Sequence, residues 1–293
     1  MMHSLYTFAS GKTENRKVLG KSEKLSVYYH DFFDYPLTFS DLIKWKVGQE
    51  GIASIKSNKN IISKDGFYFL EGKGSSIYKR LLRIRVSAKK MEIAKKASFF
   101  LAVIPGIKMI AVTGSLAMAN AADGSDIDLM IITKKGWLWT TRLVSYLFIW
   151  LAGIQTRKAS DKTQKDKLCL NMWMDESDLS WKRQDRNIYT AHEISQILPL
   201  VNKNGTYENF LHANGWVKTF WPNAIRGNEK RSVKKDEIIK SSISGFPLKV
   251  FENLAFGLQY LYMKSKITRE TVTKTRAIFH PQDWGKLILS RLN

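Results

Sequence analysis

Two short polar motifs near the middle of the chain have the residue types and the spacing to do chemistry. Gly114-Ser115 follows an apolar run that ends at Val112. Asp126-Ile127-Asp128 opens a second apolar run, which continues to Ile132. Apolar runs of this length between polar turns predict buried strands, and the Ala-rich piece between the motifs predicts a short helix.

The two aspartates indicate a metal site. Successive side chains of a strand point to opposite faces, so Asp126 and Asp128 should point the same way while Ile127 packs behind them. Two adjacent carboxylates repel each other unless a cation lies between them. Hard divalent ions take oxygen ligands of this kind and usually share them with phosphates. The pair therefore predicts a Mg²⁺ site, which Mn²⁺ could also fill.

Gly114-Ser115 has the residue types for the phosphate side of the same site. Glycine lets the backbone approach an anion closely, the start of the following helix would point N–H groups at it, and the Ser115 hydroxyl adds a donor. Ser125, in the turn before the aspartates, is a further candidate contact with the nucleotide. A tight turn followed by two solvated aspartates is the purely structural alternative. The combination favours phosphoryl or nucleotidyl transfer from a nucleoside triphosphate.

The order of Gly114-Ser115, the spacer Leu116 to Ser125 and Asp126-Ile127-Asp128 resembles the signature of the polymerase-β-like nucleotidyltransferase superfamily. It is most similar to the small, minimal nucleotidyltransferase domains of bacteria and archaea. The resemblance implies an α/β chain with the α+β nucleotidyltransferase fold, a small mixed sheet with helices. It also implies Mg²⁺-dependent transfer of a nucleoside monophosphate from an NTP to an acceptor hydroxyl.

The resemblance further implies a third carboxylate on a third strand, which commonly helps to bind a metal and to deprotonate the attacking hydroxyl. Residues 168–174 predict this strand, and its matching position holds Asn171. An asparagine can offer an oxygen ligand but cannot act as a base. Asp175 and Glu176 could take its place only if the strand were placed differently. Nucleotide and metal binding are therefore expected, whereas turnover is the open point.

Other charged residues near the motifs are candidates for the same site. Lys134, Lys135 and Arg142 follow the second motif strand and could neutralise phosphate charge, with a surface position as the alternative for each. Segment 155–167 is polar and rich in lysine, which predicts a loop that could lie near the site. His192-Glu193 lies in a predicted helix and could reach the site, although such residues are more often structural.

An apolar stretch over 137–154 directly follows the second motif strand. Its uninterrupted part begins only after Arg142, and it is shorter than the roughly twenty residues that a membrane-spanning helix needs. We therefore expect a buried helix and no stable membrane insertion, with a helix at a membrane interface as the alternative.

The N-terminal part of the chain predicts a module of its own. Residues 1–22 predict a flexible tail. Residues 23–74 predict three short helices followed by a hairpin around Asp65-Gly66, which is the order of a winged helix. Winged helices bind DNA or pack against protein. Several lysines permit DNA binding and also fit a solvated face: Lys44, Lys46, Lys56, Lys59 and Lys64.

Residues 75–176 form the expected nucleotidyltransferase domain, which begins with a long helix over 75–104. Residues 177–225 form a helical region, with helices predicted over 179–198 and 206–220.

Residues 226–240 are charged and predict a linker, and residues 241–293 predict C-terminal helices. The strongest of these helices, over 247–263, is apolar nearly all round. We therefore expect it to be buried in the body or against a second subunit, which leaves an oligomer open.

Composition adds one strong signal. The chain has 293 residues and a formal net charge of +21. Such an excess indicates an anionic partner, most simply a nucleotide or a nucleic acid that meets the basic surface. The single cysteine, Cys169, excludes an internal disulfide and a Cys-based zinc site, which fits a cytoplasmic protein.

Two functions are consistent with these residues. The first is a Mg²⁺-dependent nucleotidyltransferase whose acceptor is left open between RNA ends, a protein hydroxyl and a small molecule. The second is a catalytically impaired nucleotide-binding protein that acts as a winged-helix DNA-binding regulator. Asn171 separates the two, because the transfer reaction needs a base for the attacking hydroxyl.

Overall fold

The structure is a computed structural model, and it describes residues 19–54, 59–158, 161–225, 246–265, 267, 270–279 and 284–292. The chain is a mixed α/β protein, as the sequence predicts. Most of the tail expected over 1–22 and all of the linker expected over 226–240 lie outside the described residues. The domain boundaries drawn from the sequence stay predictions.

The N-terminal module, residues 19–74, contains three short helices and a three-stranded antiparallel sheet of order β1-β3-β2. Its elements are α1 (Lys21–Asp31), β1 (Leu37–Thr38), α2 (Phe39–Lys44), α3 (Gln49–Ser54), β2 (Ile61–Lys64) and β3 (Phe67–Leu70). Asp65 and Gly66 join β2 to β3 with φ angles of 52° and 76°, the left-handed pair that a tight hairpin turn needs. Three helices followed by a hairpin are therefore observed, with a short additional strand before α2.

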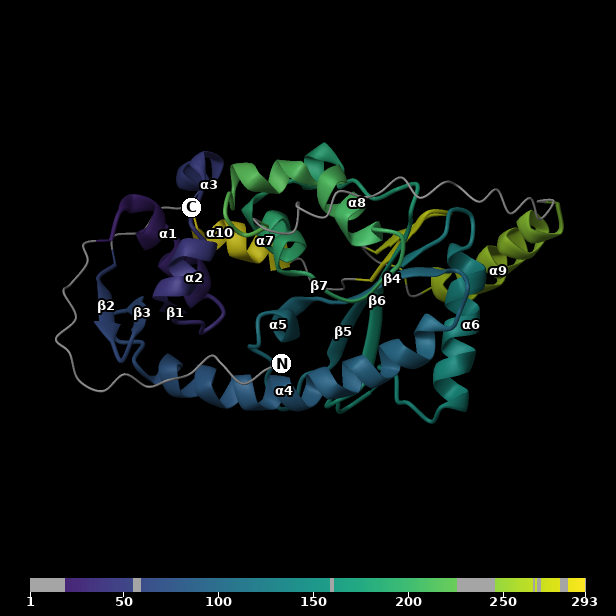
Figure 1. Cartoon of the computed structure of the whole chain (residues 1–293), viewed down its shortest axis with the longest axis horizontal. Helices are drawn as coiled ribbons and strands as arrows, with labels where there is room; N and C mark the ends of the chain where they lie inside the picture. The colour runs from purple at the N-terminus through teal and green to yellow at the C-terminus, as the bar shows by residue number, and fades with distance from the viewer. Residues whose placement is uncertain are drawn as a thin grey trace.

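α4 (Ser75–Ala102) is a long helix that confirms the one predicted over 75–104. Figure 1 shows it running along one side of the molecule, from the N-terminal module to the central sheet. Near its start, the Arg80 guanidinium donates to the Pro36 carbonyl and pairs with Asp41 at 2.8 Å. These contacts hold the module against the helix.

The central sheet has six strands in the order β7-β4-β5-β6-β9-β8. They are β4 (Ile107–Val112), β5 (Ile127–Thr133), β6 (Leu168–Asp175), β7 (Leu198–Asn202), β8 (Thr271–Val272) and β9 (Arg276–Ile278). β5 and β6 are parallel, and the other neighbouring strands are antiparallel. Parallel neighbours need a crossover, and α6 (Leu138–Leu151) forms part of it. The sheet is thus mixed, and the strand predicted over 168–174 is β6.

The remaining helices are α5 (Gly114–Ala117), the short 3₁₀ helix η1 (Arg183–Asp185), α7 (Ile188–Gln196), α8 (Thr206–Ala213), the 3₁₀ helix η2 (Gly215–Thr219), α9 (Phe246–Lys264) and α10 (Trp284–Leu292). Two predicted helices are shorter than expected. Asn187 caps the backbone N–H groups of residues 189 and 190, so α7 begins at Ile188 instead of at 179. The helix predicted over 206–220 breaks at Asn214, after which η2 continues.

The two faces of the central sheet pack against different elements. Met109 and Ala111 of β4 belong to a core shared with the N-terminal module, α7, α8 and α10. Ile110 and Val112, which alternate with them, belong to a second core shared with α4, α6 and α9. The alternation of side chains along β4 thus separates the two layers that enclose the sheet.

α6 and α9 are only half buried in this single chain, which corrects the expectation that α6 is a buried helix and that α9 is buried in the body, whereas burial of α9 against a second subunit stays a prediction. α6 packs Trp139 and Ile149 inward, but Trp150 is 73% exposed. On α9 Ala255 is buried, whereas Leu261 is 70% exposed. The two helices pack against each other and against the body, and their outer faces stay open within the described part of the chain. No described helix is long and apolar enough to cross a membrane.

Candidate functional site

Asp126 and Asp128 lie at the start of β5 and point to the same face of the sheet. A carboxylate oxygen of each lies within 4.8 Å of the other and of the Cys169 Sγ on β6. Asp128 and Cys169 are direct neighbours in the parallel pair of strands. The shared face is the one that strand alternation predicts for positions two residues apart.

The Gly114-Ser115 turn lies directly against this carboxylate pair. Gly114 has a φ of +59°, a conformation that favours glycine, and a Cβ at this position would lie 3.2 Å from Asp128 Oδ2. Thr113 N–H donates to the Asp128 carbonyl at 3.1 Å, which ties the turn to β5. α5 is a single helical turn, so the effect of a helix start on an anion is smaller than the sequence suggests.

A cleft of about 500 Å³ opens over these residues, and Gly114, Ser115, Asp126, Asp128 and Asn171 all line it. Its other walls come from distant parts of the chain. The N-terminal module contributes His30, Phe33 and Tyr35, α7 contributes Tyr189, His192, Glu193 and Gln196, and the C-terminal segments contribute Phe279 and Trp284. A volume in this range is typical of sites for small molecules such as a nucleotide.

Asn171 occupies the third-strand position, where it faces the aspartates. Its Nδ2 donates to Asp128 Oδ1 at 2.7 Å, and the side chain is buried. Its Oδ1 is buried as well and has no hydrogen-bond partner among the described residues. A buried acceptor without a partner is costly, so a ligand that donates a proton or coordinates this oxygen would remove the cost.

Arg157 is a site residue that the sequence did not single out. Its Nη1 donates to Asp126 Oδ2 at 2.8 Å, and it lines the cleft together with Gln164. Both residues belong to the polar segment 155–167, which was expected to be a loop near the site. The guanidinium supplies a positive charge beside the carboxylate pair, in the region where a cation is expected.

Burial and charge shape the ionisation of Asp128. Burial, followed by the negative charge of Asp126, raises the pKa of Asp128 to about 7, while a hydrogen bond from Cys169 and the charge of Arg157 act in the opposite direction. Burial and the two carboxylates also raise the pKa of the Cys169 thiol, so this thiol stays protonated at neutral pH. Cys169 is therefore a hydrogen-bond donor to the site and a poor ligand for a hard cation.

Glu193 is a second, half-buried carboxylate of the cleft. Its Oε1 accepts from Gln196 Nε2 at 2.7 Å. Burial, followed by the charge of Asp128, raises the pKa of Glu193 to about 7. His192 and Glu193 were predicted as residues that could reach the site, and both line the cleft.

His192 meets His30 of the N-terminal module across the same cleft wall. Their Nε2 atoms lie 3.2 Å apart, within a cluster of aromatic rings that includes Trp45. Burial lowers the pKa of His30 to about 4, and burial also lowers the pKa of His192. Both rings are therefore neutral at neutral pH.

Three predicted nucleotide contacts, Lys134, Arg142 and Ser125, are not among the residues that line the cleft. Lys134 follows the far end of β5 from Asp128, about 20 Å along the strand, and its ammonium lies over the Trp137 ring. Arg142 on α6 donates to Gln259 on α9 at 2.6 Å and packs behind Phe279. The predictions for Lys134 and Arg142 were wrong for one reason: the crossover between the parallel strands β5 and β6 carries the chain away from the site after β5.

Ser125 and the acidic residues after β6 also have structural roles. The Ser125 hydroxyl donates to the Ala122 carbonyl at 2.9 Å, which closes the turn before the aspartates. Asp175 accepts from the Gly136 and Ser177 backbone N–H groups. Glu176 accepts from the backbone N–H of Lys135 at 3.2 Å. Asp175 and Glu176 lie at the end of β6 far from Asp128, so neither replaces Asn171.

Lys90 of α4 holds the turn that precedes the aspartates. Its side chain is fully buried, and its Nζ donates to the carbonyls of Asp123 and Ser125 at 3.0 and 2.7 Å. The same Nζ pairs with Asp166 Oδ1 at 2.7 Å. One ammonium thus joins the turn before Asp126 to the segment that leads into β6.

The donors present fit a hard divalent cation. Two carboxylates and the Asn171 Oδ1 are oxygen ligands of the kind that Mg²⁺ and Mn²⁺ take, and the buried Oδ1 lacks a partner. Comparisons of the chain with protein families, with curated proteins and with solved structures found no match. The geometry of the site therefore has to carry the functional argument.

Proposed function

We propose that this protein is a Mg²⁺-dependent nucleotidyltransferase that moves a nucleoside monophosphate from an NTP to an acceptor hydroxyl. One observation carries the proposal: Asp126 and Asp128 share a face beside the Gly114-Ser115 turn, at the wall of a cleft of nucleotide size. The same constellation is what the resemblance to polymerase-β-like nucleotidyltransferases implies.

Asp126, Asp128 and Asn171 Oδ1 would hold the divalent cation. When bound, this cation would neutralise charge on the triphosphate and on the transferring phosphate. The Gly114 backbone could approach a phosphate closely, and the Ser115 hydroxyl would donate to it. Arg157, which pairs with Asp126 at 2.8 Å, would supply a guanidinium to the phosphates.

Glu193 is our candidate for the group that accepts the proton of the attacking hydroxyl. Asn171 has no basic atom, whereas Glu193 lines the same cleft from α7. A carboxylate whose pKa is raised to about 7 is well matched to proton transfer at neutral pH. The missing third-strand carboxylate would thus be replaced from a helix.

We infer that the N-terminal module has a winged-helix-like fold that serves mainly as a wall of the cleft. Its helices and its β1-β3-β2 sheet have the order of a winged helix, and it supplies His30, Phe33 and Tyr35 to the cleft. Residues 19–54 and 59–70 contain as many carboxylates as lysines. The exposed side of α3 presents Gln49, Glu50 and Ala53. This balance is a poor fit to DNA, which is bound through an excess of basic residues.

The alternative function is a nucleotide-binding regulator without turnover, and Asn171 is the observation that favours it. An NTP labelled at the α-phosphate, Mg²⁺ or Mn²⁺, and total RNA, protein extract or small-molecule acceptors would separate the two. We expect label transfer that Asp126→Asn and Asp128→Asn abolish. Asp123→Asn, an exposed aspartate of the preceding turn, is the matched control and should transfer normally.

The outcomes of this assay differ clearly. Metal-dependent NTP binding without transfer to any acceptor class would support the regulator. Salt-dependent DNA binding that survives both aspartate variants would strengthen that result. Absence of both NTP binding and transfer in the wild-type protein would contradict both functions.

A further inference from the structure

One end of the molecule carries an exposed apolar surface that the cleft does not use. It is formed by the outer faces of α6 and α9 and the last turns of α4, and Figure 1 shows α6 and α9 at the end opposite to α1, α2 and α3. We call this surface the apolar end. Its exposed members include Phe99, Trp150, Leu151, Phe251, Leu254 and Leu261, each more than half exposed.

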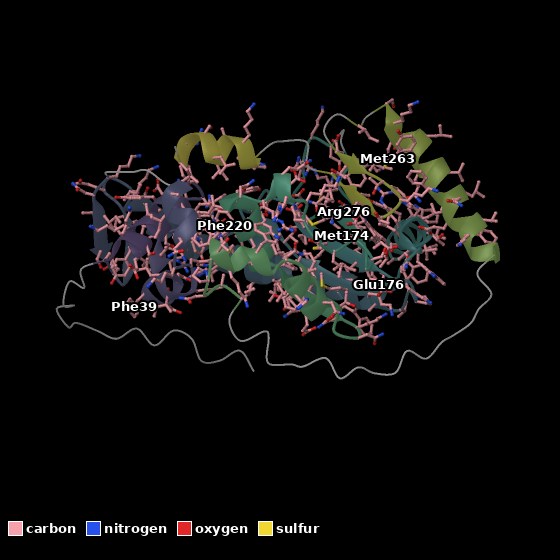
Figure 2. All side chains as sticks on the ribbon, turned by 90° about the horizontal axis from the view of Figure 1, so that it is seen from above. Phe39, Met174, Glu176, Phe220, Met263 and Arg276 are labelled. Atoms are coloured by element: carbon pink, nitrogen blue, oxygen red, sulfur yellow. The ribbon has the colours of Figure 1, made fainter. Side chains whose placement is uncertain are left out.

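The apolar side chains follow the spacing of a helix face. Leu147 and Leu151 are four residues apart on α6, and Leu254 and Leu258 are four apart on α9, so each pair lies on one side of its helix. The opposite sides of the two helices are buried in the second core. Figure 2 labels the buried Met263 of α9, and side chains on the opposite, outer side of this helix project away from the rest of the molecule. Contiguous exposed apolar surface of this kind marks an interaction site.

Lysines dominate the exposed charges at the rim of the apolar end, and the one carboxylate of α4, Glu92, pairs with Lys95 at 2.8 Å. Lys96 on α4 and Lys249 and Lys264 on α9 are exposed at its rim. Glu252 is the only carboxylate in the sequences of α6 and α9, and it is used internally. Its oxygens accept from the backbone N–H groups of Trp139 and Thr140 at 2.7 and 2.9 Å, which caps the start of α6.

Exposed apolar side chains with lysines at the rim favour an anionic lipid surface over a second copy of the chain as the binding partner. A second copy of the chain would bring another net charge of +21 against a rim of lysines, with no exposed carboxylate on either helix to pair with them. An anionic lipid surface offers apolar chains for the leucines and aromatic rings and negative headgroups for the lysines. We propose that the apolar end docks on the surface of an anionic lipid bilayer, with α6 and α9 lying in the interfacial layer.

Vesicle sedimentation with the full chain tests the proposal. We expect binding to vesicles of phosphatidylcholine and phosphatidylglycerol, weaker binding in high salt, and little binding to phosphatidylcholine alone. The variant Trp150→Ser/Leu151→Ser/Leu254→Ser should bind at least about tenfold more weakly, because three exposed apolar groups are lost. The matched control is Ile43→Ser/Tyr78→Ser/Leu82→Ser, whose exposed side chains lie outside the apolar end and whose binding should be unchanged.

A second readout does not depend on the triple variant being folded. Lipids brominated in their acyl chains should quench the wild-type tryptophan fluorescence on binding. Trp150→Phe keeps an aromatic ring at this position, so it should bind the same vesicles with less quenching. Asp128→Asn should bind them as the wild type does, because the proposal is independent of the chemistry in the cleft.

Several results would overturn the proposal. They are equal binding to neutral and anionic vesicles, equal loss of binding in the control triple variant, and unchanged quenching in Trp150→Phe. A dimer in lipid-free buffer at micromolar concentration that the apolar-end variant dissociates would show that a second copy occupies the surface instead.

Discussion

Asp128 combines the features that make a metal ligand costly in the free protein. It is packed beside Asp126, it receives a hydrogen bond from Asn171 at 2.7 Å, and its pKa is raised to about 7. A carboxyl group whose pKa is raised in the folded state destabilises the protein at pH values above that pKa. This destabilisation decreases as the pH falls and is gone below the pKa of the unfolded state. Function and stability therefore oppose each other at this residue.

Asp128→Asn should be more stable than the wild type at pH 8 in metal-free buffer, by roughly 4 kcal/mol, because the half-buried charge beside Asp126 is removed. The difference should shrink as the pH falls through 7 and vanish near pH 4. Urea unfolding with a chelator at several pH values measures it. Asp123→Asn should change stability little at every pH, and equal stability of Asp128→Asn and the wild type at pH 8 would contradict the assigned burial.

Gly114→Ala tests the close approach of the turn to Asp128. The positive φ costs a non-glycine residue about 1 to 2 kcal/mol, and the added Cβ would press on Asp128 Oδ2 from 3.2 Å. We expect lower stability together with weaker Mg²⁺-dependent NTP binding, measured by calorimetry. Gly72→Ala is the matched control, since Gly72 also has a positive φ but its Cβ would meet nothing within 4 Å. Equal loss of NTP binding in both variants would argue against a role for the turn.

Glu193→Gln tests the proposed proton acceptor. Turnover should fall by about 10²- to 10⁴-fold, the usual contribution of a general base, while Mg²⁺-dependent NTP binding persists. The wild-type rate should rise as the pH increases through 7, because the carboxylate must lose its proton before it can accept another, and the variant should lack this rise. Glu208→Gln, on α8 outside the cleft, serves as the control. Unchanged turnover in Glu193→Gln would assign the base elsewhere.

Among the elements, α4 does more than connect the module to the sheet. Arg80 near its start holds the module, and Lys90 in its middle holds the turn before Asp126. α7 brings His192 and Glu193 to the cleft because Asn187 sets where the helix begins. The position of the aspartates thus depends on α4, although no side chain of α4 lines the cleft.

Lys90→Met should loosen the turn before β5 although Lys90 does not line the cleft. Two backbone carbonyls would lose their donor, which costs on the order of 1 to 3 kcal/mol. We expect a lower melting temperature and weaker Mg²⁺-dependent NTP binding. Addition of saturating NTP and Mg²⁺ should restore part of the lost stability, because ligand selects the ordered turn. Lys89→Met, at the exposed neighbouring position, should change neither the melting temperature nor NTP binding. If Lys90→Met also left both unchanged, Lys90 would not be needed to order the turn.

At the scale of the whole molecule, the cleft exists only where distant regions meet. The N-terminal module, the central sheet, α7 and the C-terminal segments contribute its walls, and they share one hydrophobic core. His30 and His192 lie in that shared core, so their ionisation reports on the packing of the module against α7. At the opposite end of the described molecule, α6 and α9 expose apolar side chains. The proposed lipid-binding surface and the cleft therefore lie in different parts of the protein.

Acid should destabilise the protein through His30. Its pKa is lowered from 6.5 to about 4, so this penalty is absent above pH 6.5 and grows as the pH falls toward 4, where only the unfolded chain gains the proton. Raised carboxylate pKa values act in the opposite direction, so the effect is isolated by comparison with His30→Phe. Between pH 7 and pH 5 the stability of this variant should improve by roughly 2 kcal/mol relative to the wild type.

Urea unfolding at the two pH values measures this change, and His212→Phe, at an exposed position of α8, is the control. If the gap between His30→Phe and the wild type did not depend on pH, His30 would have to be accessible to solvent or charged in the folded state.

The sequence by itself determined the local parts of the site. Strand alternation placed Asp126 and Asp128 on one face, and Asp65-Gly66 specified a hairpin, because both depend on a few neighbouring residues. The third strand was predicted for the same reason, whereas the place of Asn171 at the site was implied by the family resemblance. These features follow from backbone geometry over short stretches.

Only the tertiary structure decided which distant residues share the cleft. Arg157 and Glu193 reach it and Lys134 and Arg142 do not, because the crossover from β5 to β6 and the start of α7 set where each side chain lies. The apolar pattern of 247–263 likewise predicted a helix that is apolar nearly all round, but it carried no information on which side would be buried and what would cover the rest. Such outcomes depend on contacts between residues far apart in the chain, which hydrophobic periodicity does not encode.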